Sequence, residues 1–69
     1  MATVARLYVL RIRGRLGPTA LSAFPAMVAE LRATETVLTG WLDDQAAVFG
    51  VVGQVEALGL EILELRQIT

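Results

Sequence analysis

The 69-residue sequence contains no cysteine, no histidine and no lysine. The absence of cysteine excludes disulfide bonds, thiolate metal sites and cysteine nucleophiles. The absence of histidine removes the commonest general base and the commonest metal ligand, so ordinary zinc sites are nearly excluded as well. Because no disulfide can hold so small a fold together, apolar packing must supply its stability.

The sequence also lacks a strong net charge and a long apolar run. Its six arginines nearly balance seven acidic residues, for a net charge of -1, so no broad field attracts nucleic acid or an acidic membrane. No segment reaches the roughly 18 apolar residues of a membrane-spanning helix. Arg6, Arg11 and Arg13 interrupt the region where a signal peptide would be apolar. We therefore expect a cytoplasmic protein that binds neither nucleic acid nor membrane.

Apolar residues are abundant for so short a chain, at 55% of the total. A domain of this size buries only about 60% of the surface that its unfolded chain exposes. A lone monomer is therefore expected to leave an apolar patch in water, and self-association is the usual way to cover one. We predict a single domain over residues 1–69 that forms a homo-oligomer, a dimer before any larger assembly.

Hydrophobic periodicity predicts three elements in the first half of the chain. Residues 5–13 alternate as a strand, with Tyr8, Leu10 and Ile12 on one face. The other face carries Leu7, Val9, Arg11 and Arg13, and it would be open in a monomer. A short helix over 19–24 follows, with Pro18 in its first turn and Pro25 at its end. Residues 26–32 then alternate as a second strand.

Three further elements follow in the second half. Residues 36–42 form a strand close enough to the preceding one for a hairpin. A helix over 44–58 begins at Asp43 or Asp44 as N-cap and ends before Gly59. The last strand covers 61–68, where the apolar parity switches between Ile62 and Leu63. That switch indicates either a β-bulge or two partly covered faces.

The order strand, helix, strand, strand, helix, strand predicts an α+β fold, the ferredoxin-like βαββαβ plait. Such a plait has a four-stranded antiparallel sheet with a short first helix and a longer second helix on one face. Right-handed crossovers place the first and third strands in the centre. The opposite face of the sheet is then left open.

Three segments of the second half stand out: Thr36-Val37-Leu38-Thr39-Gly40, Asp44-Gln45-Ala46-Ala47 and Leu58-Gly59-Leu60-Glu61. At these segments the sequence resembles a family of short, uncharacterised bacterial proteins common in actinobacteria. The resemblance covers residues from about 8 to 66 and is strongest in the second half. The sequence departs from the family pattern at Trp41 and at Val48-Phe49. The resemblance implies a compact α+β plait and supplies no catalytic residues.

The open sheet face is the first candidate functional surface, packing against the same face of a second copy. Trp41 is its best anchor, because large aromatic side chains at a buried centre dominate interface energy. Arg11 and Arg13 would lie at the rim, paired with Glu30, Glu61 or Glu64 within the chain or across the interface. The predicted interface residues are Leu7, Val9, Arg11, Arg13, Val37, Trp41 and Leu63 or Leu65.

A strip of small residues on the second predicted helix is a rival surface. It consists of Ala46, Gly50, Gly53 and Ala57. Glycine inside a helix costs about 1 kcal/mol relative to alanine, so two of them need a reason. Either the strip packs tightly against the first helix of the same chain, or it contacts an oligomer partner or walls a small pocket. An outward Phe49 would favour a partner.

The loop of Gly14, Arg15 and Gly17 precedes a helix start, where free N–H groups can hold a phosphate or carboxylate. This loop supports an alternative function, a small-ligand regulatory module resembling ACT domains, which share this plait and bind amino acids at subunit interfaces. No arrangement of residues indicates acid–base catalysis. The sequence therefore predicts a non-enzymatic interaction protein that needs no cofactor or metal and whose partner is itself.

Overall fold

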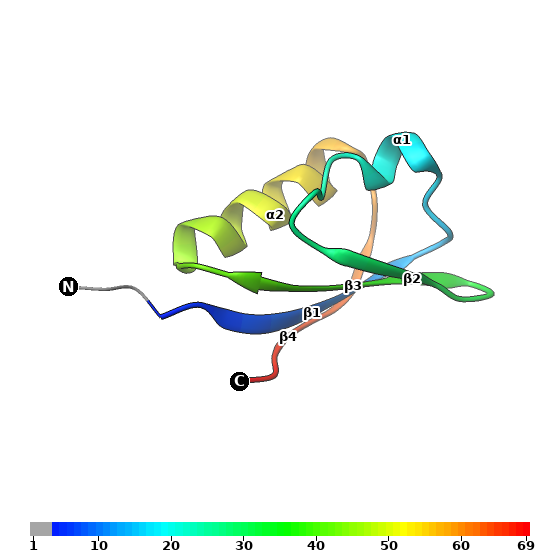
Figure 1. Cartoon of the computed structure of the whole chain (residues 1–69). Helices are drawn as coiled ribbons and strands as arrows, with labels where there is room; N and C mark the ends of the chain where they lie inside the picture. The colour runs from blue at the N-terminus through cyan, green and yellow to red at the C-terminus, as the bar shows by residue number, and fades with distance from the viewer. Residues whose placement is uncertain (1–3) are drawn as a thin grey trace.

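The computed structural model describes residues 4–69 and contains four strands and two helices (Figure 1). Residues 1–3 of the predicted domain lie outside the described residues. In chain order the elements are β1 (Arg6–Arg13), α1 (Pro18–Leu21), β2 (Val28–Leu31), β3 (Glu35–Leu42), α2 (Gln45–Ala57) and β4 (Ile62–Gln67). The strands form one antiparallel sheet in the order β2-β3-β1-β4. The α+β class, the antiparallel four-stranded sheet and the central places of β1 and β3 are confirmed.

Both helices lie on one side of the sheet, and the other side is open (Figure 1). The core between the sheet and the two helices contains Leu10 and Ile12 from β1 and Leu38 from β3. Val55 of α2 and Phe24, which follows α1, close it from above. The alternation of β1 therefore directs its even-numbered residues to the helices, as predicted.

Helix α2 begins and ends at the residues that its capping chemistry predicts. Asp44 is the N-cap, and its Oδ1 accepts a hydrogen bond from the Ala47 N–H at 2.8 Å. At the other end Gly59 has φ +71, a conformation that side chains disfavour. The N–H groups of Gly59 and Leu60 donate to the carbonyls of Glu56 and Val55, which is the Schellman arrangement.

Helix α1 is shorter than the predicted span of 19–24. It starts at Pro18, as expected, but its helical residues end at Leu21. Tight turns then carry the chain onward, and the Phe24 N–H donates to the Leu21 carbonyl at 3.0 Å. Pro25 disfavours a helical conformation at Phe24, and the Ala23 N–H already bonds three residues back, to the Ala20 carbonyl at 3.1 Å, so the α-helical pattern stops before that. The result is a single helical turn with Phe24 inserted into the core.

Strand β4 contains a β-bulge, so the first of the two alternatives for its parity switch is confirmed. Arg11 pairs with Glu64 while the next residue, Ile12, pairs with Ile62, which leaves Leu63 as the extra residue. Beyond the bulge Leu65 pairs with Leu10, so it lies on the helix side of the sheet. The prediction that Leu65 belongs to the open face is wrong, because the bulge shifts the alternation by one residue.

Strand β2 is shorter than the predicted span of 26–32, because the chain first passes close over the end of β3. A Cβ atom on Gly40 would lie 2.9 Å from the Ala26 carbonyl oxygen, so only glycine allows this approach. Pairing with β3 then runs from Val28 to Leu31. The predicted hairpin is confirmed, and the Arg32 N–H donates to the Glu35 carbonyl across it at 2.9 Å.

Candidate functional site

The open sheet face gathers residues from all four strands, because residues opposite one another in an antiparallel pair share a face. The predicted residues of β1 and β3 do share this face. Leu7, Val9, Arg11 and Arg13 lie opposite Trp41, Thr39, Val37 and Glu35 in turn. Val28 and Glu30 extend these rows on β2, and Arg66 and Glu64 extend them on β4.

One half of this face is an ion-pair cluster. Arg11 lies between Glu35 and Glu64, with N–O distances of 3.2 and 3.1 Å. The hydrogen bonds that Arg11 donates to Glu35, and secondarily to Glu64, raise the pKa of Arg11 above its ordinary value. Arg13 pairs with Glu61 at 3.1 Å. The prediction that Arg11 and Arg13 pair with acids among Glu30, Glu61 and Glu64 is confirmed for Glu64 and Glu61.

Arg32 completes the cluster from the hairpin end. It lies 3.5 Å from both Glu30 and Glu35. The side chain of Glu35 is therefore shared between two arginines. Glu30, which was predicted as a partner of Arg11 or Arg13, pairs with Arg32 instead. Exposed pairs contribute only about 0–1 kcal/mol each, so the cluster orients side chains more than it stabilises the fold.

Val9 and Val37 are already buried within the single chain, at 9% and 7% exposure. They were expected to be open in a monomer, and that expectation is wrong. Val37 lies between Glu30 and Arg11 in the sheet register. The aliphatic stems of such long charged side chains cover neighbouring apolar surface. These two valines therefore have little area left to give to a partner.

The other half of the face carries an exposed apolar surface that we call the Trp41 patch: Leu7, Val28, Thr39 and Trp41. Trp41 is 58% exposed and Val28 is 76% exposed. Beside them lies a hollow of about 350 Å³, lined by Leu7, Ala26, Val28, Thr39, Gly40 and Trp41. All six lining residues are uncharged. Apolar surface on the open face is thus concentrated at one end, next to the ion-pair cluster.

The small-residue strip of α2 is open, so the first alternative for it, tight packing against the first helix, is wrong. A Cβ atom on Gly50 or Gly53 would meet no atom within 4 Å. The reason is that α1 is only one turn long and does not reach across α2. Phe49 is also outward, at 64% exposure.

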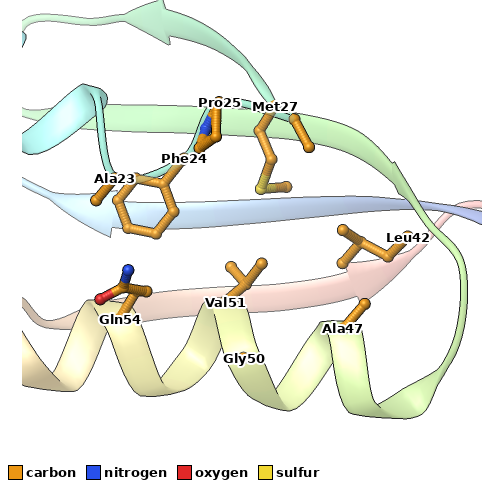
Figure 2. Close-up of a pocket in the computed structure, with 10 residues that line it drawn as sticks. Ala23, Phe24, Pro25, Met27, Leu42, Ala47, Gly50, Val51 and Gln54 are labelled. Carbon is orange, nitrogen blue, oxygen red and sulfur yellow. The ribbon is translucent and has the colours of Figure 1, made fainter.

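Beside Gly50 lies an apolar pocket of about 250 Å³ between α2 and the segment before β2. Figure 2 shows Phe24 and Met27 on one side of it and Val51 and Ala47 of α2 on the other. Leu42 of β3 closes one end. Gly50 therefore forms part of an open wall, which matches the pocket alternative for the strip.

We expect Gly50→Ala to stabilise the protein. Its Cβ meets open space, and alanine is about 1 kcal/mol better than glycine inside a helix. The melting temperature should rise by about 4–8 °C, measured by circular dichroism. Gly53→Ala should behave alike, because its surroundings are equally open. If either variant instead lowered the mass of the assembly, the strip would be an interface.

Two backbone N–H groups of the predicted anion loop already donate hydrogen bonds within the chain. The Gly14 N–H donates to the Thr34 carbonyl at 2.7 Å, and the Leu16 N–H donates to Thr36 Oγ1 at 3.0 Å. Arg15 is exposed, and Gly17 precedes a helix of a single turn. These contacts give no support to a ligand site at Gly14, Arg15 and Gly17.

Residues 4–69 hold neither a metal-binding cluster nor a membrane-spanning helix. No group of three or more acidic, cysteine or histidine side chains is arranged to hold a metal ion. Neither of the two described helices has the length and apolar character to cross a membrane.

Residues 7–66 match the family model described as Domain of unknown function (DUF8691). The chain belongs to the DUF8691 family. The matched range begins at Leu7 and ends at Arg66, so the whole Trp41 patch and every ion pair described above lie within the DUF8691 domain. Comparison with curated proteins and with solved structures gave no match.

Two residues of the DUF8691 surface were missed by the sequence analysis. Glu35 was left outside the predicted strand over 36–42, although it shares its parity with Val37 and therefore extends the same strand face. Val28 was placed on a strand but not on the interface. Its pairing with Thr39, which itself pairs with Val9, puts it on the open face. Parity could have identified both residues once the strand pairing was known.

Proposed function

We propose that the DUF8691 domain is a non-enzymatic protein that associates with a second copy of itself through the open sheet face. The observation that carries this proposal is an exposed Trp41 beside a hollow of about 350 Å³ on the same patch. In a two-fold dimer the same patch of each copy meets the other. Each Trp41 can then enter the hollow of the opposite copy, which makes the patch self-complementary.

The expected energies are of the size that such a pair requires. Burying a large apolar side chain contributes about 1.5–3 kcal/mol. Trp41, Val28 and Leu7 from each copy would bury surface together, against an association cost of about 4–15 kcal/mol. The ion-pair cluster would lie at the rim, with Arg11 and Arg13 keeping their own partners.

The architecture is proposed to be the ferredoxin-like plait. Three features support this: the βαββαβ element order, the central places of β1 and β3, and two helices on one side of the sheet. The resemblance to short actinobacterial proteins supports a bacterial, cytoplasmic setting.

Trp41 supplies a direct test, because it is the only tryptophan in the chain. On dilution from tens of micromolar, the two faces should separate. The fluorescence of Trp41 should then shift to the red, and acrylamide should quench it more strongly. Trp41→Asp should halve the mass of the assembly in light scattering. Phe49→Asp, an equally exposed aromatic on α2, should leave the mass unchanged. A wild type that stays monomeric at tens of micromolar would disprove the proposal.

A further inference from the structure

We propose that the outer edge of β4 pairs with the same edge of a second copy, joining two four-stranded sheets into one continuous sheet. This contact is separate from the open face and does not involve Trp41. It rests on the segment Glu64-Leu65-Arg66, which is complementary in charge to itself when reversed. Edge strands with unpaired backbone groups are ready templates for such pairing.

The backbone of β4 directs the N–H and C=O groups of alternate residues outward, as this pairing requires. The Ile68 N–H donates to the Leu7 carbonyl at 2.7 Å, so residue 68 directs its backbone toward β1. Alternate residues of an antiparallel strand bond to the same neighbour. Arg66 and Glu64 therefore also bond to β1, whereas Leu65 and Gln67 direct their N–H and C=O groups outward.

A two-fold axis at Leu65 uses those outward groups. Leu65 then forms a hydrogen-bonded pair with its own counterpart. Glu64 lies opposite Arg66 of the second copy, and the reverse pair forms on the other side of the axis. Such positions have the shorter cross-strand spacing, so the opposite charges come close together. Both side chains lie on the open face, since they pair with Arg11 and Val9.

The same register also buries apolar side chains. Leu65 lies on the helix side of the sheet and is 40% exposed in the single chain. It would meet the Leu65 of the second copy. One register therefore satisfies the outward backbone groups of Leu65, the charges of Glu64 and Arg66, and the exposed side chain of Leu65 together.

The opposite edge of the sheet carries the same triplet but cannot use it in this way. Glu30-Leu31-Arg32 on β2 would need residue 33 extended opposite Ala29. Residues 33 and 34 form the bend of the hairpin instead. Arg32 is also shared between Glu30 and Glu35, whereas Arg66 lies 3.7 Å from Glu64 of its own chain. In β4 residues 64–67 follow the bulge with unbroken pairing to β1, so β2 provides a control with the same triplet on a shorter edge.

The charge reversal Arg66→Glu tests the edge, because it places two carboxylates opposite each other on both sides of the axis. With face and edge contacts together, the wild type should be a tetramer in native mass spectrometry. Arg66→Glu should break the edge contact and give a dimer held by the open face. Trp41→Asp should break the face contact and give a dimer held by the edge. The double variant should be a monomer. Arg32→Glu, the same change on β2, should leave the tetramer. Exchanging the charges with Glu64→Arg and Arg66→Glu together should restore it.

Amide hydrogen exchange of the wild type decides the question without any variant. The outward amides of Leu65 and Gln67 should exchange at least about ten-fold more slowly than Ala29 and Leu31, their equivalents on β2. Equal exchange on the two edges would overturn the edge contact. If Trp41→Asp left the mass unchanged while Arg66→Glu halved it, the face proposal would fail and the edge would stand. The reverse result would remove the edge alone.

Discussion

Thr36→Val is expected to lower the free energy of unfolding by about 2–4 kcal/mol, although the two side chains have nearly the same shape. The Thr36 side chain is fully buried. Its hydroxyl accepts the Leu16 N–H at 3.0 Å and donates to the Gly14 carbonyl at 2.8 Å. Valine leaves both backbone groups without their partner, and each unpaired buried group costs about 1–3 kcal/mol. Urea denaturation measures the loss.

Thr36→Ser is the matched control, because it keeps the hydroxyl and removes a methyl group worth about 0.8 kcal/mol. A chain of this length has a total stability of roughly 3–10 kcal/mol, so the valine change should remove a large share of it. If serine were as damaging as valine, the hydroxyl bridge would not be what holds the loop of residues 14–17 against β3.

Gly40→Ala is expected to lower the free energy of unfolding by about 1–3 kcal/mol, the usual effect of overfilling a packed site. The new Cβ would lie 2.9 Å from the Ala26 carbonyl oxygen and 3.0 Å from Met27 Cγ. A methionine side chain can move away, but a backbone oxygen moves only with its chain. The segment before β2 would therefore shift, and it lines both the hollow and the apolar pocket.

Gly50→Ala is the matched control, because the same change from glycine to alanine should raise the stability of the protein on α2 and lower it on β3. Chemical denaturation of the two variants side by side gives the comparison. A neutral Gly40→Ala would mean that the segment at Ala26 does not rest on β3 in solution.

The parts of the fold that were predicted correctly depend on local chemistry. The alternation of β1 identified the face toward the helices, because strand periodicity is a property of consecutive residues. Asp44 and Gly59 marked the ends of α2 because capping uses residues adjacent in sequence. Even the bulge at Leu63 could be read from parity, although only the pairing of β1 with β4 distinguished it from two covered faces.

The parts that were not predicted depend on distant segments. The burial of Val37 follows from Glu30 and Arg11, which come from two other strands. The open strip around Gly50 follows from the length of α1, which Pro25 shortens. Periodicity within one element cannot report which long side chains cover its neighbours.

The bulge has a consequence for how the length of this chain can vary. Leu63 is the residue that faces no partner of its own on β1, while Ile62 and Glu64 face consecutive residues there. Deleting Leu63 would leave every other cross-strand neighbour unchanged and merely straighten the ladder. Relatives one residue shorter at this point can share the same sheet, whereas a deletion elsewhere in β4 would turn its side chains over.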